Sequence, residues 1–320
     1  MQLRRTLVAF LAAVTLALSL AGCGRGVAAP AASSVSPSPL STTAAYPAGS
    51  SDQHIEVDGV ARDYRIFIPA QLSPDAPLVI MLHGGFGDAQ QAESSYGWDA
   101  QATADQFVVA YPNGVDRAWN AGGGCCGQPA AKGVNDVAFI AAVVAQIEAR
   151  TSIDPSRVFA TGISNGGMMA YRLACDTSLF AAIGPDSATL LGDCESPHPL
   201  SVIHIHGLAD QNIPFAGGEG DGYAKIDGPP VQTTIAQWRT IDSCSPPTST
   251  LAGVVTTSIA LCPSGNAVEL ITIAGAGHQW PGSAERPVLE KVLGTDPPSQ
   301  ALNATETIWA FFAAHPGAIT

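Results

Sequence analysis

One short segment of the chain could do covalent chemistry: the serine between glycines in Gly162-Ile163-Ser164-Asn165-Gly166. An apolar run precedes it and a second one follows, which places the serine where a strand turns directly into a helix. Such a turn exposes the serine oxygen, and only glycine-sized neighbours two residues away avoid a clash. The backbone N–H of Asn165 would lie at the helix N-terminus and could stabilise an oxyanion. The spacing therefore predicts that Ser164 is a nucleophile.

A serine hydroxyl attacks only after a base has removed its proton, so the sequence must also supply a histidine and a supporting acid. His278 follows the last apolar strand in a glycine-rich loop, and we predict that it is the base. With this kind of serine turn, the acid lies between the serine and the histidine in the chain. We expect Asp210 to be the acid, because it closely follows a strand. Asp186, which ends the preceding strand, is the alternative.

The second oxyanion donor is expected in the loop after the strand predicted at 78–82, which reads His83-Gly84-Gly85-Phe86-Gly87. Glycine allows a backbone N–H to approach a carbonyl oxygen without interference from a side chain. Gly85 is the first candidate for this donor, and Phe86 is the second.

Flat apolar side chains near these residues are candidates for substrate binding. Trp280 is two residues from the predicted base, Trp119 lies in a glycine-rich loop, and Phe86 follows the predicted oxyanion donor. Each side chain could form a wall for an acyl chain or an aromatic acid, although packing in the core is an equal alternative for the two tryptophans. The glycine-rich segment 211–230 follows the acid directly and is expected to cover the site.

The spacing of His204 and His206 places both imidazoles on one face of a strand, where they could bind a metal ion. Such a pair is more often packed and hydrogen-bonded. No CxxC or HxxH spacing occurs in the chain, so we expect no metal site. Serine hydrolysis also implies no cofactor.

The elements that must position these residues alternate between strands and helices, which is typical of an α/β fold with a mainly parallel sheet and helices on both faces. Strands are expected at 54–57, 62–68, 78–82, 107–111, 158–163, 181–183, 201–205 and 268–273. The first two form a hairpin that turns at Asp58-Gly59. Helices are expected at 136–150, 165–174, 231–241 and 302–314.

The N-terminus has the features of an export signal. Two arginines precede an uncharged apolar run, and the box Leu20-Ala21-Gly22-Cys23 follows, which resembles a bacterial lipobox. We therefore predict that residues 1–22 are a signal peptide and that Cys23 is lipidated. Residues 23–52 are rich in Ala, Ser, Thr and Pro and are expected to be a tether, which leaves 53–320 as one catalytic domain. An ordinary cleaved signal and an uncleaved membrane helix are the alternatives.

The remaining six cysteines suggest disulfides, because an even set in an exported protein usually pairs. Proximity in the sequence favours Cys175–Cys194 and Cys244–Cys262. Each would close a loop of about 20 residues and contribute roughly 3 kcal/mol. Cys125 and Cys126 either bond to each other or pair elsewhere.

The overall charge limits the partners. Acidic residues outnumber basic ones by 27 to 14, and only 13% of residues are charged. Phosphate binding requires a clustered positive surface, so nucleic acid is excluded as a partner, and electrostatic docking on anionic lipid is disfavoured. Any attachment to a membrane would then depend on the lipid at Cys23.

Several of these segments resemble one family. The strand and loop at 78–85, Trp119-Asn120-Ala121-Gly122 with Cys125-Cys126-Gly127, the serine turn, and His278-Gln279-Trp280-Pro281-Gly282 are similar to segments of the polyhydroxybutyrate depolymerase and feruloyl esterase family. The resemblance covers nearly all of 53–320 and is closest to the lipoprotein esterases of actinobacteria. The sequence departs from the family pattern at two places. Gly122-Gly123-Gly124 contains an additional glycine, and Asp186 stands where the family usually has an uncharged residue.

This resemblance implies an α/β-hydrolase fold and hydrolysis of carboxylic esters by Ser164, Asp210 and His278. The substrates would be small esters, hydroxyalkanoate oligomers or aromatic esters of the feruloyl type. An acyltransferase or peptidase on the same fold is the alternative enzyme, since the fold does not determine the acceptor. A surface adhesion protein without activity would not need the three residues together.

Overall fold

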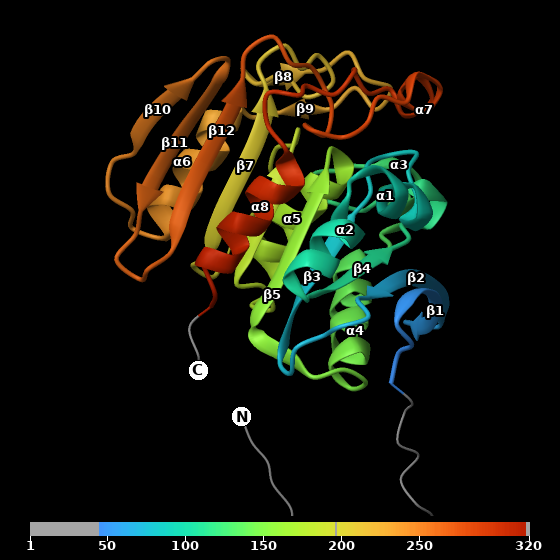
Figure 1. Ribbon diagram of the computed structural model, residues 1–320. Helices are drawn as coiled ribbons and strands as arrows, with labels where there is room; N and C mark the ends of the chain where they lie inside the picture. The colour runs from blue at the N-terminus through green and yellow to red at the C-terminus, as the bar shows by residue number, and fades with distance from the viewer. Residues whose placement is uncertain (1–44, 196, 318–320) are drawn as a thin grey trace, which may run out of the picture. The chain divides into compact units, whose positions relative to one another are not determined.

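The computed structural model describes residues 45–195 and 197–317, which are shown in Figure 1. Within these residues ten strands form one sheet in the order β1-β2-β4-β3-β5-β6-β7-β12-β11-β10, and β8 and β9 form a separate pair. The strands are β1 (Gly49–Val57), β2 (Val60–Ile68), β3 (Ala76–Leu82), β4 (Val108–Pro112), β5 (Ile153–Ile163), β6 (Ala182–Asp186), β7 (Ser201–Gly207), β8 (Gly218–Glu219), β9 (Asp227–Gly228), β10 (Thr248–Ala252), β11 (Val255–Leu261) and β12 (Ala267–Ile273). The helices are α1 (Ala89–Ser95), α2 (Trp98–Asp105), the 3-10 turn η1 (Val115–Arg117), α3 (Gly127–Lys132), α4 (Asp136–Glu148), α5 (Asn165–Asp176), α6 (Val231–Ile241), α7 (Pro287–Leu293) and α8 (Ala304–Ala314).

The middle of the large sheet is parallel, from β4 through β3, β5, β6 and β7 to β12. Strands β3, β4, β6 and β7 are buried along their whole length, as expected where both faces are covered. Because these strands run in the same direction, their carboxyl ends meet at one edge of the sheet. The predicted nucleophile, acid and base follow β5, β7 and β12, so all three lie at this edge.

Helices cover both faces of the sheet. On one face α4, α5 and α6 share a core that includes Phe139, Met169 and Trp238. On the other face α1, α2 and α8 pack against the strands, with Trp98 and Phe312 in a second core. Figure 1 shows α8 in front of the central strands and α5 and α6 behind them. The expected mainly parallel sheet with helices on both faces is confirmed.

The chain enters the sheet earlier than predicted. Strand β1 begins at Gly49, four residues before the expected domain boundary, and its residues alternate between half-buried and exposed. Tyr46 lies earlier still, and its buried hydroxyl is 2.7 Å from that of Tyr64 on β2. The alternation of β1 is weak in the sequence because its first half-buried residues, Gly49, Ser51 and Gln53, are small or polar, so the start of the strand resembled the tether.

The predicted helices and strands occur with small shifts at their ends, but several elements were not predicted. The strands β10 and β11 form an antiparallel hairpin beside β12. All of β10 and most of β11 are exposed or half-buried, so their sequence lacks the apolar pattern of a strand. Helices α1, α2, α3 and α7 span at most eight residues each, too short for a clear helical period.

Three disulfides link the described cysteines: Cys125–Cys126, Cys175–Cys194 and Cys244–Cys262. The two loop-closing pairs are confirmed, and the adjacent cysteines bond to each other. Disulfides are typical of proteins that fold outside the cytoplasm, which agrees with the predicted export.

The predicted signal peptide, Cys23 and most of the tether lie outside the described residues. Residues 43–320 form one compact unit. In the part of the chain that is described, none of the helices has the length and apolar character needed to cross a membrane.

Candidate active site

Ser164 occupies a tight turn between β5 and α5. Its backbone has φ 56° and ψ −124°, outside both strand and helix conformations, and its N–H donates to Asp186 O at 2.9 Å. A Cβ on Gly162 would lie 2.6 Å from Leu82 O, and a Cβ on Gly166 would lie 2.3 Å from the same atom. Both glycines are therefore required by the close approach of β3, as the GxSxG spacing predicts.

The predicted acid and base are in direct contact. His278 Nδ1 donates to Asp210 Oδ2 at 2.8 Å, and both side chains are buried. The other carboxylate oxygen, Oδ1, accepts the backbone N–H groups of Asn212 and Ile213, each at 2.8 Å. Burial raises the pKa of the Asp210 carboxyl, but the His278 imidazole and these hydrogen bonds outweigh burial and leave the pKa below its usual value. Asp210 is therefore a carboxylate at neutral pH.

Two loops bring the acid and the base together. The N–H of Leu208, after β7, donates to Ile273 O at 3.0 Å, and the N–H of Ala209 donates to Ala276 O at 2.8 Å. A Cβ on Gly207 would lie 2.4 Å from Ala276 O, so glycine is needed where the two loops touch. The loops after β7 and β12 thus form one hydrogen-bonded unit that carries Asp210 and His278.

Asp186, the alternative acid, lies at the end of β6 and is 1% exposed. Neither of its carboxyl oxygens has a hydrogen-bond partner among the described residues. Burial raises the pKa of Asp186 well above its ordinary value, and the nearby negative charge of Asp210 raises it further. The structure places Asp210, and not Asp186, against the imidazole.

Ser164 and His278 line one small cavity together with Gly84, Gly85, Ile163 and Tyr96, which we call the serine cavity. The N–H of Phe86 is already donated to Arg117 O at 2.9 Å, so it is not free for an oxyanion. Gly85 lines the cavity, and Asn165 is the first residue of α5, where a backbone N–H has no intrahelical acceptor. The arrangement favours Gly85 and Asn165 as the donors.

Comparison with known proteins agrees with this geometry. Residues 63–215 match the family described as Esterase PHB depolymerase. NocK of Nocardia uniformis subsp. tsuyamanensis, whose name places it among the esterases, is 32% identical over 267 residues, covering 72% of this chain and 74% of NocK. Feruloyl esterase C of Emericella nidulans is 31% identical over 211 residues, covering 60% of this chain and 74% of that protein.

The chain belongs to the Esterase PHB depolymerase family. Among solved structures, the acetyl xylan esterase from Aspergillus awamori is similar in fold, with a TM-score of 0.56 and 16% identity, covering 76% of this chain and 99% of that one. The fold is therefore that of the α/β-hydrolases, and family membership makes the protein an ester-hydrolysing enzyme.

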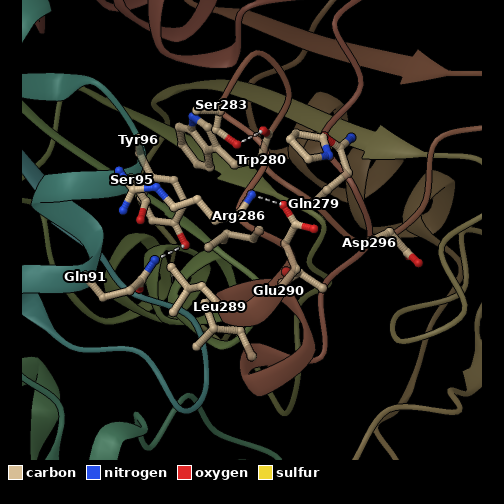
Figure 2. Close-up of a pocket in the computed structure, with 15 residues that line it drawn as sticks. Gln91, Ser95, Tyr96, Gln279, Trp280, Ser283, Arg286, Leu289, Glu290 and Asp296 are labelled. Carbon is tan, nitrogen blue, oxygen red and sulfur yellow. Dashed lines mark hydrogen bonds between the residues drawn. The ribbon is translucent and has the colours of Figure 1, made fainter.

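A second cavity of this esterase adjoins the serine cavity and shares Gln91, Tyr96, Ile163, Leu293 and Thr295 with it. We call it the aromatic cavity, because the rings of Tyr96 and Trp280 pack in its wall with centroids 5.0 Å apart. Figure 2 shows α1 and Tyr96 on one side of this cavity and Arg286, Leu289 and Glu290 on the other. Trp280 thus lines the cavity that adjoins the one containing Ser164.

The cover of the site in this esterase comes from an unexpected segment. Residues of 283–298, which include α7, line the aromatic cavity, and Leu293 and Thr295 also reach the serine cavity. Arg286 holds this segment to the end of α1, since its Nη2 donates to Ser94 O at 2.6 Å. The segment predicted as a cover, 211–230, lines neither cavity, although Tyr223 contacts Phe86 with ring centroids 5.2 Å apart. Phe86 is 44% exposed and lines neither cavity.

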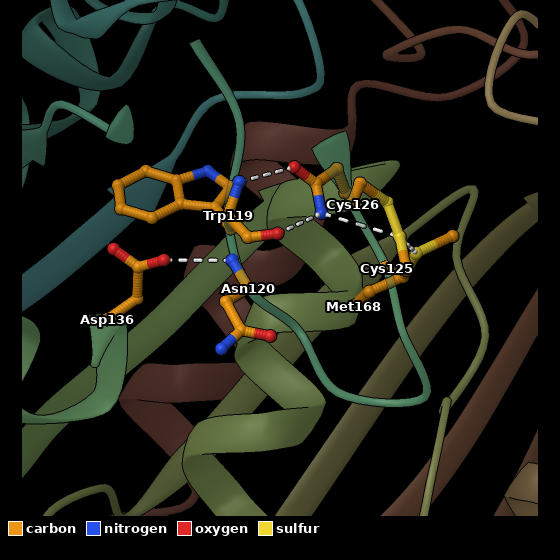
Figure 3. Close-up of a disulfide and its surroundings, with 7 residues drawn as sticks. Trp119, Asn120, Cys125, Cys126, Asp136 and Met168 are labelled. Carbon is orange, nitrogen blue, oxygen red and sulfur yellow. Dashed lines mark hydrogen bonds between the residues drawn. A yellow bond between two sulfur atoms is a disulfide. The ribbon is translucent and has the colours of Figure 1, made fainter. Parts of the chain in front are cut away.

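Trp119 is fully buried and supports the serine turn instead of lining a cavity (Figure 3). Its backbone N–H donates to Asn165 Oδ1 at 2.7 Å, and its backbone carbonyl accepts from Asn165 Nδ2 at 3.1 Å. Its indole N–H donates to His83 O at 2.8 Å. The side chain of Asn165, the residue after Ser164, thus clamps the loop at 119–126, and Trp119 packs in the core.

Two further positioning residues were not predicted. Asp296 Oδ2 accepts the backbone N–H of His278 at 2.7 Å, and the N–H of Asp296 donates to His278 O at 2.7 Å, so this residue fixes the base from the covering segment. His83 Nε2 accepts the N–H of Gly114 at 3.0 Å, which leaves Nδ1 to donate to Gly84 O at 2.8 Å. Burial lowers the pKa of His83 to about 4, so it is neutral and stabilises the oxyanion loop. Contacts between residues so far apart leave no local signal in the sequence.

The histidine pair on β7 is hydrogen-bonded, as the alternative to metal binding predicted: His204 Nε2 and His206 Nδ1 are 3.0 Å apart. Among the described residues, no group of three or more His, Cys, Asp or Glu side chains could hold a metal ion.

Proposed function

We propose that this esterase is a serine carboxylesterase that acts through an acyl-enzyme, with Ser164 as nucleophile, His278 as base and Asp210 as supporting acid. The observation that carries the proposal is the 2.8 Å hydrogen bond between His278 Nδ1 and Asp210 Oδ2, on an imidazole that lines the same cavity as Ser164. Of the histidines in the described part of the chain, His278 is the one that lines the cavity of Ser164.

The proton transfers follow from this hydrogen bond. Because His278 Nδ1 carries the proton donated to Asp210, Nε2 is left with a lone pair and can accept the proton of Ser164 Oγ. The serine oxygen then attacks the ester carbonyl, and the N–H groups of Gly85 and Asn165 stabilise the oxyanion. The imidazolium returns its proton to the leaving alcohol. Water then repeats the sequence on the acyl-enzyme and releases the acid.

The lowered pKa of Asp210 supports this sequence, since a carboxylate that stays ionised stabilises the imidazolium. This stabilisation of the imidazolium is present at neutral pH, and it is lost at acidic pH because Asp210 becomes protonated.

We propose that the substrates are esters of short, hydroxyalkanoate or aromatic acids. The aromatic cavity supports an acyl group larger than acetate, because Tyr96, Trp280 and Leu289 offer apolar surface beside Ser164. The relatives named feruloyl esterases agree with an aromatic acid.

The test is the substitution Ser164→Ala, measured with p-nitrophenyl esters of rising acyl length, methyl ferulate and hydroxybutyrate oligomers. We expect turnover to fall by about four to six orders of magnitude while the circular dichroism spectrum is unchanged. As the matched control, Ser152→Ala alters a serine that bonds to Asp75 Oδ1 at 2.7 Å and lines neither cavity, and it should keep turnover. Full activity of Ser164→Ala would disprove the mechanism.

We further propose that the protein is exported and anchored by a lipid on Cys23. The lipobox Leu20-Ala21-Gly22-Cys23 supports the anchor, and the three disulfides support export. In a bacterial host, Cys23→Ala should move the enzyme from the membrane fraction to the soluble fraction. Unchanged membrane retention of the variant would rule out lipidation at this residue.

A further inference from the structure

A chain of buried hydrogen bonds lies behind the acid, on the side away from the serine cavity. Tyr171 Oη on α5 is 2.8 Å from His204 Nδ1 on β7. His204 Nε2 is 3.0 Å from His206 Nδ1, and His206 Nε2 is 2.8 Å from Ile213 O. All three side chains are completely buried. The mechanism proposed above uses none of them.

The direction of every hydrogen bond in this chain is set at one end. A backbone carbonyl only accepts, so His206 Nε2 must carry a proton and donate to Ile213 O. If His206 is neutral, its Nδ1 then accepts from His204 Nε2, and His204 Nδ1 in turn accepts from the Tyr171 hydroxyl. One carbonyl therefore fixes the same Nε2–H tautomer on both histidines, opposite to the Nδ1–H tautomer of His278.

The environment keeps both imidazoles neutral. Burial lowers the pKa of His204 well below its ordinary value, and the neighbouring His206 lowers it further. Burial also lowers the pKa of His206, against the opposing effects of Asp210 and of the Ile213 carbonyl. The rings of Trp238 and Phe215 pack against the two ends of this hydrogen-bonded chain, at Tyr171 and His206 respectively. A neutral imidazole has one donor and one acceptor, which is what each position in the chain requires.

The hydrogen-bonded chain ends at the backbone of Ile213, which also holds the carboxylate of Asp210. The carbonyl of Ile213 accepts from His206, and the N–H of the same residue donates to Asp210 Oδ1 at 2.8 Å. His206 Nε2 also lies 3.6 Å from Asp210 Oδ2, the oxygen that binds His278. A shift of His206 would therefore move the turn at 210–213 and change the geometry of the hydrogen bond that Asp210 accepts from His278.

We propose that Tyr171, His204 and His206 form a positioning chain that fixes the orientation of Asp210 through Ile213. The role rests on the proposed function, since it acts through the acid of that mechanism. His206 is a positioning residue and does not touch the substrate. It makes no metal site, because the lone pair of each ring is used within the chain.

The first test is a direct measurement of the tautomers by nitrogen–proton correlation NMR of the 15N-histidine-labelled enzyme near pH 7.5, with assignments from His→Gln variants. We expect the Nε2–H tautomer for His204 and His206 and the Nδ1–H tautomer for His278. An Nδ1–H tautomer or an imidazolium at His206 would overturn the proposal.

The second test is a double-mutant cycle. His206→Phe should lower kcat for p-nitrophenyl acetate by about 10- to 100-fold, with KM changed by less than about 3-fold, because the acid is misplaced while the cavity is intact. In the Asp210→Asn background the same substitution should change kcat by less than about 2-fold, since there is no carboxylate left to orient. His206→Gln retains an N–H donor and should recover most of the lost rate.

The matched control is His315→Phe, because His315 also bonds to a backbone carbonyl, Phe311 O at 2.8 Å, and lines neither cavity beside Ser164. It should leave kcat unchanged. If His206→Phe does not fold, the cycle is run with Tyr171→Phe, which keeps the ring and removes only the hydroxyl. An equal loss of kcat in both backgrounds means a general structural role and overturns the positioning chain. The proposed function itself fails only if Ser164→Ala is active, so the two failures are distinguishable.

Discussion

Two aspartates lie at the carboxyl ends of neighbouring strands of this esterase, Asp186 as the last residue of β6 and Asp210 in the loop after β7, and their hydrogen bonds differ. Asp210 accepts two backbone N–H groups and an imidazole, and its pKa is lowered. Asp186 has no hydrogen-bond partner for either oxygen among the described residues, and its pKa is raised. Hydrogen bonds, more than distance along the chain, therefore decide which carboxyl group can serve as the acid.

This difference predicts opposite results for two isosteric substitutions. Asp210→Asn should lower kcat by about three to four orders of magnitude, because the amide cannot stabilise an imidazolium. Asp186→Asn should keep kcat within a few-fold of the unsubstituted enzyme. Steady-state kinetics with p-nitrophenyl acetate would check both, and equal losses would reassign the acid.

Asp186→Asn should also change the dependence of stability on pH. Because its pKa is higher in the folded than in the unfolded protein, Asp186 favours folding most below its ordinary pKa, and this contribution is lost as pH rises toward the folded pKa. Asparagine does not titrate, so the variant should gain stability over the parent by up to about 1.4 kcal/mol per pH unit in that window. Urea unfolding at pH 5 and pH 8 measures the gain, and the exposed Asp193→Asn is the control. A stability gain that is smaller at pH 8 than at pH 5 would contradict a raised pKa of Asp186 in the folded protein.

At this scale the sequence was sufficient to locate the residues proposed for catalysis, and it did not reveal the residues that orient them. Ser164, Asp210 and His278 follow strands in recognisable loops, and the structure places each where the pattern predicted. His83 and Asp296 act through hydrogen bonds to distant backbone groups, which no spacing reveals. Trp119 was expected at the substrate and packs in the core instead, because a glycine-rich neighbourhood does not indicate on which side of a loop a side chain lies.

At the scale of elements, the covering segment that contains α7 lines both cavities near the serine. Val288 and Val292 on α7 are exposed, whereas Leu289 and Leu293 line the cavities. The segment is held to α1 by Arg286 and to the base by Asp296. Closure of such segments commonly controls access to enzyme sites.

Arg286→Ala should therefore loosen the cover. We expect kcat/KM for a long-chain p-nitrophenyl ester to rise several-fold relative to that for the acetate, since bulky acyl groups gain most from a cover that opens more often. Arg157→Ala is the matched control, because Arg157 pairs with Asp154 in the first half of β5 and lines neither cavity. An unchanged ratio in the Arg286 variant would exclude α7 as the determinant of acyl length.

The elements that the sequence predicted are those with long apolar patterns. The buried strands β3 and β7 and the helices α4 and α6 begin within two residues of their expected positions. The hairpin β10–β11 and α7 are mostly exposed, so they are held by their pairing partners and by single polar contacts. Strand pairing and single polar contacts leave no periodic pattern of apolar residues in the sequence.

At the scale of the whole molecule, two disulfides cross-link helical segments to neighbouring loops. Cys175–Cys194 joins α5 to the loop before β7, and Cys244–Cys262 joins the loop after α6 to the loop after β11. Both pairs were predictable from their short separation in the sequence. The order of the strands was not predictable from hydrophobic pattern, because it depends on which buried edges pair; the family resemblance implied only an α/β-hydrolase fold with a mainly parallel sheet.

Replacing Cys244 and Cys262 by alanine should lower the free energy of unfolding by about 3 kcal/mol, because the bond constrains the unfolded chain. Neither cysteine lines the cavities, so kcat at 25 °C should be retained. Urea unfolding and esterase assays would measure the two quantities. A loss of kcat in the folded double variant would contradict the expectation that the Cys244–Cys262 disulfide does not affect the active site.

The clamp between Asn165 and Trp119 has a consequence for engineering of this enzyme. The residue after the nucleophile uses its backbone for the proposed oxyanion and its side chain to anchor a loop, so it has little tolerance to randomisation. Libraries aimed at new acyl preferences should leave positions 165 and 296 fixed, since Asp296 holds the backbone of His278, and should diversify the rest of the covering segment at 283–298. There, replacements reshape the entrance without disturbing the strand that delivers the nucleophile.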